Sequence, residues 1–520
     1  MALSWDALAP YNGIVRTDII EPRDYQINII RSVYSGKNSL VVLPTGLGKT
    51  LIAVFAAAKA LSEGKKAAIL APTKPLSEQH YQSMSKLLNI DSEGVLLLTG
   101  SIGAAKRQGL VSGARVIAAT PQTLANDIKS GRLSINDFGV IIFDECHRAV
   151  GRYAYTFLAD TANEENVQMI GLTASPGSNR KRIEALATAL GIENIEIRTS
   201  TDPDVVPYVM GKYVHVVRVD TGPVIREVMA AIKPVIELHL TKLYGLGLSP
   251  FKGIDNVPKG RLLQIGDNIS KIQAQNYKFG ALYHYIYVLN LLHAYDLAAS
   301  EGLYPFISYM DGLRARPKKS KSVTSLLSNP EVVRATAAAA NAINEGVEHP
   351  KVMELIRILK SQPGSSTIVF AQYRSTIKRI VEMLRAHGIT ARAFVGKKEG
   401  VTHEQQEGVI NEFRDGKFRV LVATSIGEEG LDIPSVDTVV FYEPVPNEIR
   451  NIQRGGRAGR MRFGEIFILV ARDTKDEIYL VISRARENKM RELVYKLKRD
   501  IESGRFSSRP AKAAGQQILF

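Results

Sequence analysis

Two adjacent carboxylates stand at the end of an apolar run and are the first candidates for chemistry. Asp144 and Glu145 directly follow Val140–Phe143. If this run is a buried parallel strand, the pair lies at the carboxyl edge of a sheet, where open α/β sheets bind their ligands. There Asp144 could hold Mg²⁺, and Glu145 could orient or deprotonate a water molecule that attacks a phosphate. Taken alone, the pair also fits a strand-end turn that caps a helix.

A glycine loop about a hundred residues earlier favours the phosphate chemistry. The apolar run Leu40–Leu43 leads into PTGLGKT at 44–50, and an apolar stretch of helical length, Leu51–Leu61, follows. In this order of strand, loop and helix, glycine amides face inward and the lysine neutralises the β- and γ-phosphates of ATP. The general pattern begins with glycine, where this chain has Leu43. The expected ATP ligands are Thr45, Gly46, Gly48, Lys49 and Thr50, and Thr50 is also an expected Mg²⁺ ligand.

Arginines at a spacing of three residues indicate a second half of the site. The segment 453–460 reads QRGGRAGR, and on a helix Arg457 and Arg460 would lie on one side. Its glycines would weaken a merely solvent-exposed helix by about 1 kcal/mol each. We therefore expect Arg457 and Arg460 to reach the γ-phosphate from a second lobe as arginine fingers, with Gln453 lining the site. A solvated basic helix is the alternative.

Another loop follows an apolar run in the second half of the chain. Val420–Ala423 is followed by Thr424 and, eight residues later, by Asp432. At the carboxyl edge of a sheet, Asp432 could bond the ribose of the nucleotide and Thr424 a phosphate of a nucleic acid. A plain glycine-rich loop between a strand and a helix is the alternative.

The elements that must position these residues follow from an alternation of short β-branched runs with helical stretches. This alternation predicts an α/β fold with two doubly wound parallel sheets, in a first lobe (1–202) and a second lobe (346–505). In the first lobe the runs are Leu40–Leu43, Ala67–Ala71, Val95–Leu98, Val116–Ala119, Val140–Phe143 and Met169–Leu172, and in the second Thr367–Phe370, Ala391–Val395, Val420–Ala423, Thr438–Tyr442 and Glu465–Val470.

The strand pattern disappears between the two lobes. Residues 203–345 contain long helical patterns such as Val224–Leu246 and Ile269–Ala299, which predict a linker and an inserted all-helical domain. The tyrosines of this insertion fit either a helical core or contact with nucleic-acid bases. We expect the basic, serine-containing stretch Arg314–Ser325 to be a flexible connector and 506–520 to be a flexible tail.

Composition narrows the class of protein. Among 520 residues, 67 Lys and Arg against 52 Asp and Glu give a formal charge of +15, which favours a polyanionic partner such as nucleic acid. The single cysteine, Cys146, excludes a disulfide framework, and no Cys/His cluster has zinc-site spacing. The most apolar stretch, Ser39–Leu61, is interrupted by Pro44, Lys49 and Lys59, which argues against a membrane span. We expect a soluble, cytoplasmic, nucleoid-associated protein.

Together these segments resemble the superfamily 2 helicases of the DECH-box branch. The resemblance implies two RecA-like lobes that bind ATP between them, and it covers nearly the whole chain. Arg23 and Gln26 match the segment that recognises adenine in that family, and Thr173-Ala174-Ser175 matches the segment that couples ATP to movement. The residues that the resemblance assigns to contact with the nucleic-acid strand are Pro72, Thr73, Lys74, Thr99, Gly100, Thr120, Pro121, Gln122, Gln372 and Thr424.

Within this branch, the helical insertion and the motifs LPTGLGKT and ATPQT resemble those of archaeal Hef and its eukaryotic relative, the Fanconi anaemia group M helicase. The resemblance implies an ATP- and Mg²⁺-dependent DNA helicase that acts on forked or branched DNA in replication-fork repair and moves 3′ to 5′. Many Hef proteins carry a C-terminal nuclease, and no such domain fits after Ser503, so we expect either a helicase-only member or a truncated chain. A nuclease or a sliding clamp is the expected protein partner, and the final residues 515–520 hint at a sliding-clamp peptide. An RNA helicase of the Dicer type and an ATP-gated clamp that does not unwind stay open as alternatives.

Overall fold

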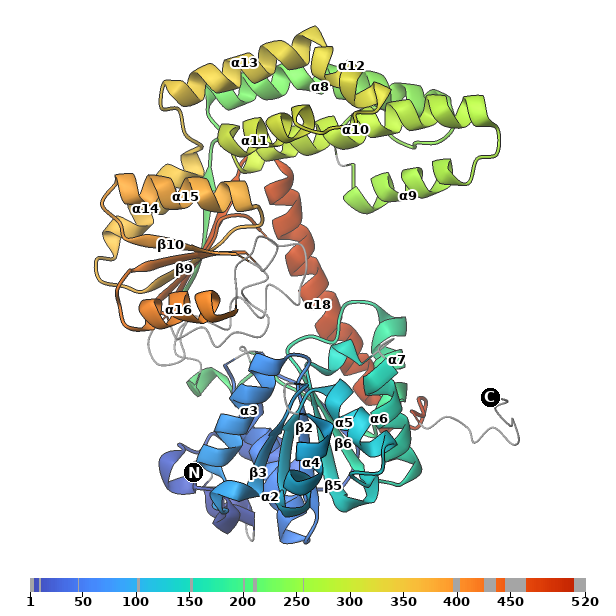
Figure 1. The fold of residues 1–520 in the computed structure, drawn as a ribbon, viewed down its shortest axis with the longest axis vertical. Coiled ribbons are helices and arrows are strands. Elements are labelled where there is room, and N and C mark those ends of the chain that lie inside the picture. Colours follow the sequence, from blue (N-terminus) through green and yellow to red (C-terminus); the bar gives the residue numbers. More distant parts are fainter. Residues whose placement is uncertain are drawn as a thin grey trace.

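The computed structural model shows two α/β lobes and a helical insertion that lies beside the second lobe (Figure 1). The second lobe and the insertion form the upper part of the molecule in this view, and the first lobe forms the lower part. The structure describes residues 4–8, 11–44, 46–100, 103–149, 153–199, 202–208, 213–255, 257–395, 403–424, 436–444 and 464–508.

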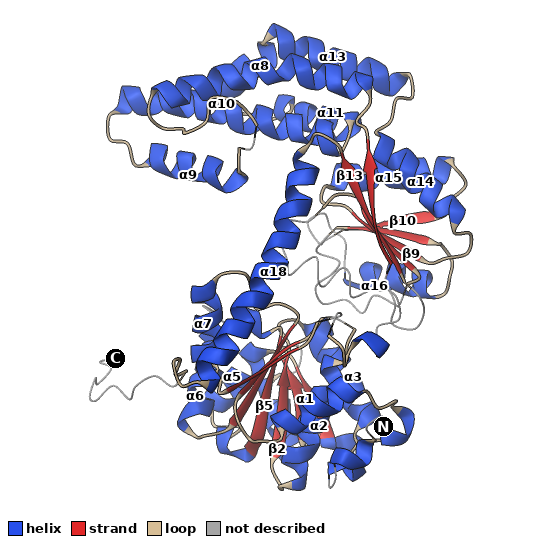
Figure 2. Cartoon of the chain, turned by 180° about the vertical axis from the view of Figure 1, so that it is seen from behind, coloured by secondary structure: helices blue, strands red, loops and turns tan. Residues whose placement is uncertain are grey.

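The first lobe is built on a parallel sheet of seven strands in the described part of the chain, in the order β3-β4-β2-β5-β6-β1-β7. Most of its strand residues are buried, as expected for strands covered by helices on both faces (Figure 2). The strands are β1 Ser39–Val42, β2 Lys66–Leu70, β3 Val95–Leu98, β4 Val116–Ala119, β5 Phe138–Asp144, β6 Gln168–Thr173 and β7 Asn194–Ile197. The helices are α1 Asp24–Val33, α2 Lys49–Ser62, α3 Lys74–Leu87, α4 Ala104–Gly113, α5 Pro121–Lys129, α6 Tyr153–Glu164 and α7 Arg180–Ala189.

The second lobe has its own parallel sheet, which contains six strands among the described residues in the order β10-β11-β9-β12-β13-β8. The strands are β8 Tyr213–Val219, β9 Thr367–Phe370, β10 Ala391–Phe394, β11 Val420–Ala423, β12 Thr438–Phe441 and β13 Glu465–Ala471. The helices that follow or flank them are α14 Pro350–Ser361, α15 Arg374–Ala386, α16 His403–Arg414 and α18 Lys475–Glu502. The predicted fold class, two doubly wound parallel sheets with an inserted helical domain, is confirmed.

The insertion is a helical bundle with its own apolar core. Tyr285 and Tyr287 are buried in that core, so these tyrosines serve packing and not contact with bases. The helices are α8 Pro223–Gly245, α9 Lys259–Ser270, α10 Gln275–Ser300, α11 Leu303–Arg314, α12 Lys321–Ser328 and α13 Pro330–Asn344.

Two sequence expectations differ from the structure. Strand β8, from the range 203–345 that we expected to form the linker and insertion, pairs with β13 and so belongs to the second sheet. The stretch Arg314–Ser325 is not a flexible connector, because its residues 321–325 all lie in α12. Ser320 caps that helix by accepting a hydrogen bond from the Val323 amide at 3.3 Å, which leaves only a short turn between α11 and α12.

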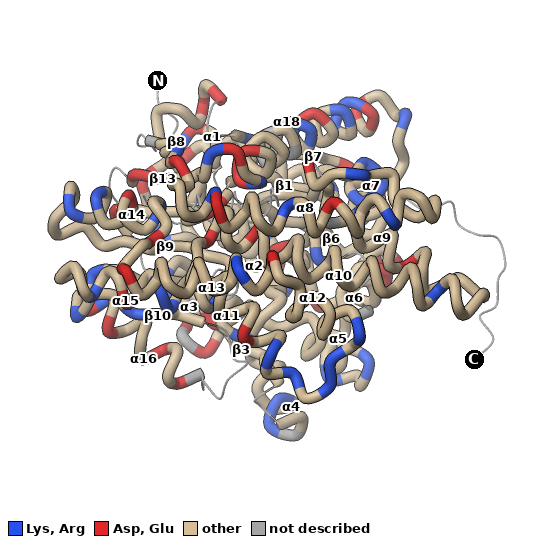
Figure 3. The backbone as a smooth tube through the Cα atoms, turned by 90° about the horizontal axis from the view of Figure 1, so that it is seen from above, with Lys and Arg blue, Asp and Glu red and all other residues tan. Residues whose placement is uncertain are grey.

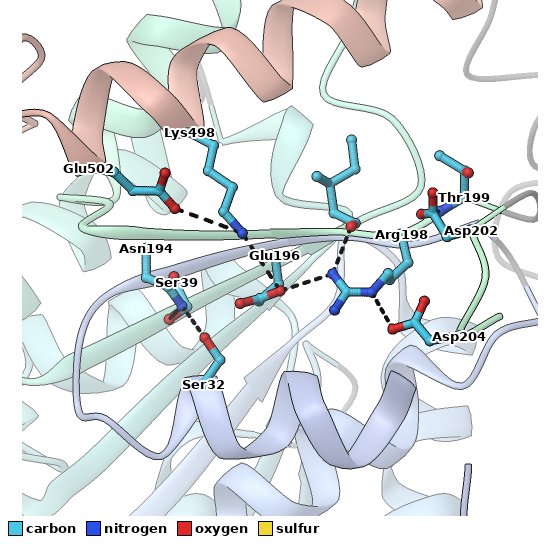
Figure 4. Close-up of polar contacts among 11 residues, drawn as sticks. Ser32, Ser39, Asn194, Glu196, Arg198, Thr199, Asp202, Asp204, Lys498 and Glu502 are labelled. Atoms are coloured by element: carbon cyan, nitrogen blue, oxygen red, sulfur yellow. Dashed lines mark hydrogen bonds and ion pairs between the residues drawn. The ribbon is translucent and has the colours of Figure 1, made fainter. Parts of the chain in front are cut away.

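Helix α18 begins at the second lobe and ends on the first (Figure 1). Met490, Val494 and Leu497 are buried in the core of the first lobe, although the sequence range 346–505 was expected to form the second lobe. Figure 4 shows Lys498 of α18 beside Glu196 of β7, with their charged atoms 4.0 Å apart. Arg198 donates to the same carboxylate at 3.2 Å. The helix therefore ties the two lobes together.

A buried lysine of the second lobe joins this lobe to the insertion. Lys351, at the start of α14, is fully buried and contacts the carboxylate of Asp476, at the start of α18. Its ammonium group also donates to the carbonyl of Ser300, the last residue of α10, at 3.0 Å. One lysine thus holds together three helices that are far apart in sequence, and breaking such a pair leaves a buried charge uncompensated.

We predict that Lys351→Met lowers the free energy of unfolding of the second lobe and insertion by about 3–5 kcal/mol, because the buried carboxylate of Asp476 loses its charged partner. Urea titration monitored by far-UV circular dichroism measures the loss of unfolding free energy. Arg334→Met is the control: its exposed pair with Glu331 should contribute less than about 1 kcal/mol. Equal losses in the two variants would contradict the assigned role of Lys351.

A second buried carboxyl group at this junction makes stability depend on pH. Burial raises the pKa of Glu301 to about 7. The positive charge of Lys351 lowers this pKa, and the negative charge of Asp476 raises it. The hydroxyl of Thr376 donates to Glu301 at 2.9 Å. Because the unfolded chain ionises this group near its ordinary value of 4.5 and the folded chain only near 7, stability falls as pH rises across that interval.

We predict that Glu301→Gln removes this fall, so that the variant gains stability relative to the wild type as pH rises, by up to about 3 kcal/mol at pH 8. Thermal melting at pH 5 and pH 8 measures the difference. Glu345→Gln, at an exposed position, is the matched control. A difference that is the same at both pH values would show that Glu301 does not titrate as described.

Candidate functional site

The strand order of the first sheet divides its carboxyl edge into two halves. The expected ATP residues follow β5, β6 and β1, which are neighbours in the sheet. The expected nucleic-acid residues follow β3, β4 and β2, which are the adjoining neighbours. All these strands are parallel, so their carboxyl ends lie along one edge.

The glycine loop enters α2 with a backbone that requires glycine. Gly46 and Gly48 have φ angles of +88° and +84°, and a side chain at Gly48 would collide with the amide of Gln26. Lys49 is the first residue of α2, and its ammonium group donates to the carbonyl of Leu43 at 3.0 Å. The loop thus brings the lysine and the amino end of a helix together, as a phosphate cradle requires. Thr45 lies outside the described residues.

The adenine-recognising segment packs directly under this loop. Tyr25 and Gln26 both donate to the carbonyl of Leu47, at 2.8 and 3.1 Å, and Arg23 donates to the Tyr25 hydroxyl at 3.4 Å. The other amide atom of Gln26, Oε1, is buried and has no hydrogen-bond partner among the described residues. A buried amide oxygen without a donor costs free energy unless a ligand supplies one, and the amino group of adenine is such a donor.

The first carboxylate of the acidic pair has a buried partner that sequence reasoning missed. His80 Nε2 lies 2.8 Å from Asp144 Oδ2, and both side chains are buried. Burial pushes the pKa of Asp144 upward, but the hydrogen bond and charge of His80, together with Lys49, outweigh burial and hold the pKa below its ordinary value. Asp144 is therefore an ionised carboxylate close to Lys49, which fits a Mg²⁺ ligand beside phosphates.

The second carboxylate stands on a strained turn and is linked to β6. Glu145 has a φ angle of +50°, a conformation that non-glycine residues adopt rarely and that clusters at functional sites. His147 Nδ1 lies 3.2 Å from Glu145 and 3.1 Å from the hydroxyl of Thr173. That hydroxyl also accepts a hydrogen bond from the Ser175 amide at 3.1 Å. The acidic pair and the Thr173-Ala174-Ser175 segment therefore form one connected network.

The nucleic-acid half of the edge presents helix starts and hydroxyl groups. Thr73 directly precedes α3 and Thr120 directly precedes α5. The Thr73 hydroxyl is buried without a hydrogen-bond partner among the described residues, whereas Thr120 bonds Thr123 at 2.8 Å. Helix starts and hydroxyls of this kind bind phosphate oxygens without reading base sequence. The neighbouring expected residues are exposed Lys74, Gly100 and Gln122, half-buried Pro72, and buried Thr99 and Pro121.

The second lobe contributes two expected residues at the ends of adjacent strands. Gln372 follows β9 and is exposed, and Thr424 follows β11 and is buried. The Thr424 hydroxyl has no hydrogen-bond partner in the described part of the chain. The remaining expected residues of this lobe, Asp432, Gln453, Arg457 and Arg460, lie outside the described residues.

Family models match both lobes. The DEAD/DEAH box helicase model matches residues 23–183, and the helicase conserved C-terminal domain model matches residues 350–462. The solved helicase domain of Hef from Pyrococcus furiosus is 41% identical and matches over 91% of this chain and all of that domain, with a TM-score of 0.73. The chain belongs to the DEAD/DEAH box helicases. The expected resemblance to Hef and the two RecA-like lobes of this helicase are confirmed.

Curated relatives extend the similarity over nearly the whole chain. A putative ATP-dependent RNA helicase of Methanocaldococcus jannaschii is 37% identical over 92% of this chain and 62% of its own length. The ATP-dependent DNA helicase mph1 of Neurospora crassa is 31% identical over 90% of this chain and 42% of its own length. The chain thus spans less than two thirds of these relatives. No helix of the described ranges is long and apolar enough to cross a membrane.

We predict that Gln26→Ala reduces the preference for ATP over GTP by about tenfold in KM, because the variant loses the buried, unpartnered amide oxygen that we expect to accept from the amino group of adenine. Steady-state hydrolysis of both nucleotides measures the ratio of the KM values. Asn28→Ala, at an exposed position of the same helix, is the control. If KM rose equally for ATP and GTP, Gln26 would support the loop without recognising the base.

Proposed function

We propose that this helicase is an ATP-dependent DNA translocase that acts on forked or branched DNA in replication-fork repair, in the 3′ to 5′ direction. The observation that carries the proposal is the divided edge of the first sheet, with phosphate chemistry on β1, β5 and β6 and strand contacts on β2, β3 and β4. The names of Hef and of the DNA helicase of Neurospora crassa support DNA as the substrate.

ATP and Mg²⁺ fit the residues present. The amino end of α2, Lys49 and Thr50 would hold the phosphates and the metal, with Asp144 as the second metal ligand. The metal would neutralise charge that develops on the phosphates. Glu145 would orient the attacking water, and we assign contact with the γ-phosphate to Arg457 and Arg460 and further contact with the nucleotide to Gln453 and Asp432. Arg23, Gln26 and Thr45 belong to the same nucleotide site.

The nucleic-acid strand would lie along the other half of the edge and cross to Gln372 and Thr424. Its contacts are helix starts, hydroxyls and cations, which bind phosphates in any sequence. Lys and Arg residues are spread over many segments of the chain, α4 and α15 among them, in agreement with the charge of +15 (Figure 3). Binding is therefore directed to backbone and shape and weakens as salt rises.

The hydrogen bond between His80 and Asp144 connects the two halves. His80 lies on α3, the helix whose first residues are part of the expected strand contact, and Asp144 ends β5 in the ATP half. A shift of the strand at Thr73 and Lys74 can thus reach the metal ligand through one helix. We assign to this contact the coupling between strand binding and ATP hydrolysis.

The setting of this activity follows from the same proposal. The enzyme is soluble, cytoplasmic and nucleoid-associated, and it works with a nuclease partner or a sliding clamp. An RNA helicase is the second candidate, because the relative from Methanocaldococcus jannaschii carries that name. An ATP-gated clamp without unwinding is the third, and the experiments below separate these functions.

We predict that Glu145→Gln lowers ATP turnover by at least about 100-fold and preserves ATP binding, because the variant cannot activate water. Turnover is measured by phosphate release and binding by a fluorescent ATP analogue. Glu165→Gln, at an exposed position after α6, is the control and should hydrolyse ATP normally. Unchanged turnover in Glu145→Gln, or lost turnover with retained unwinding, would contradict the mechanism.

We predict that forked DNA stimulates ATP hydrolysis and is unwound faster than a four-way junction or an RNA duplex. A panel of these substrates with 3′ or 5′ single-stranded arms measures both rates and the direction. Preferential unwinding of RNA would favour the second candidate. Stimulated hydrolysis without strand displacement on any substrate would favour the clamp.

A further inference from the structure

A large cavity lies where the insertion meets the second lobe, outside the ATP site. Its volume is about 850 Å³, within the roughly 300–1,000 Å³ typical of ligand sites. Helices α10 to α12 form one side, and the ends of β9 and β12 with the start of α18 form the other. Gln372, Arg316, Lys318 and Lys319 line it and are exposed, so the cavity opens to solvent on their side.

Aromatic rings form one wall of this cavity. The ring of His293 lies 4.7 Å from Tyr309 at right angles and 5.6 Å from Tyr373. Tyr479 of α18 lines the cavity as well. Rings from the insertion and from the second lobe therefore meet in one place. Aromatic surfaces of this kind stack on nucleobases whatever the base identity, because every base has a flat π face.

Charge is graded from the mouth of the cavity to its floor. The mouth carries the three exposed cations of the turn between α11 and α12. The interior carries carboxylates: Asp296, which Lys475 contacts at 2.6 Å, and the buried Glu301 and Asp476. A phosphate would be attracted to the three cations at the mouth. The amino and imino groups of a base, in contrast, can donate to carboxylates.

The cavity adjoins the strand path of the proposed function. Gln372, which we place on that path, is also a lining residue, and Tyr373 follows it in the sequence. A DNA strand that runs from Gln372 past the mouth of the cavity can thus turn one base into the cavity. The phosphate of that nucleotide stays beside the cations of the turn between α11 and α12. A duplex cannot do so without unpairing, so the occupant must come from unpaired DNA.

We propose that this cavity is a pocket for a single unpaired nucleotide at the branch point of the bound DNA, with its base inside and its phosphate at Arg316, Lys318 and Lys319. This inference rests on the proposed function. The pocket holds one nucleotide of the opened strand against the insertion and thereby fixes the position of the branch relative to the second lobe.

The experiment scans a DNA fork with one abasic residue at successive positions of its single-stranded arm. The affinity of the full chain for each fork is measured by fluorescence anisotropy without ATP. An abasic residue at one position next to the branch should weaken binding at least about fivefold more than an abasic residue at the neighbouring positions. This is the effect expected for the loss of one stacked base. Leu289→Trp, which fills the cavity from α10, should reduce that extra loss to the level of the neighbours.

Leu263→Trp is the matched control, because Leu263 is exposed on α9 of the same insertion. The extra loss should persist in this variant. If Leu289→Trp melts at a lower temperature than the wild type, Lys318→Ala combined with Lys319→Ala replaces it, with Lys271→Ala as its control. The double variant and its control both remove exposed positive charge from the insertion, but only Lys318 and Lys319 line the cavity, so only the double variant should reduce the extra loss.

The outcomes separate the pocket from the proposed function. Tight fork binding with no abasic position that stands out would overturn the pocket and leave the function intact. An extra loss that persists in the cavity variants would overturn it too. If wild-type protein bound no fork at all, the proposed function would fail, and the pocket with it.

Discussion

The hydrogen bond between His80 and Asp144 is the contact on which the arrangement of the site depends. It is buried, it is 2.8 Å long, and it joins the two halves of the same sheet edge. An isolated carboxylate would not stay ionised in such a place, because burial disfavours charge. His80 and Lys49 reverse that effect and hold Asp144 in its ionised form. The same bond fixes α3 against the end of β5, so Lys74 at the start of this helix and Asp144 are positioned together.

Two elements do not lie in the lobe that their place in the sequence suggests. Strand β8 enters the second sheet before the insertion begins, and α18 returns from the second lobe to the first. Lys351 of the second lobe donates to the carbonyl of Ser300 in the insertion, and it pairs with Asp476, the second residue of α18. A movement of the second lobe relative to the first must therefore carry the insertion with it and must bend or shift α18. The insertion and the second lobe then move as one body.

Local sequence patterns predicted most of the fold and the placement of the glycine loop and the acidic pair at one edge of the first sheet. Strands such as β4 and β11 are continuous apolar runs, because helices cover both faces of their sheets, and the glycine loop and acidic pair have fixed spacings. Strand β8 was missed because its place depends on pairing with β13, some 250 residues later. No pattern within 213–219 states which sheet it joins.

The residues that the sequence did not reveal act through tertiary contacts. His80 is one polar residue in an ordinary amphipathic helix, and only the folded sheet brings it to Asp144. Lys351 would be expected on the surface, yet it is fully buried against a residue 125 positions away. A signal for α12 was present, since Ser320 precedes a helical pattern, but the surrounding basic residues favoured a loop.

The measurement that tests the account most directly is the stimulation of ATP hydrolysis by forked DNA in His80→Ala, with Ser83→Ala of the same helix as control. The account predicts that the ratio of stimulated to basal hydrolysis falls towards one in His80→Ala, while DNA binding without ATP and the ratio in Ser83→Ala stay at wild-type values. An unchanged ratio in His80→Ala would contradict it, because strand binding and hydrolysis would then be coupled by another route.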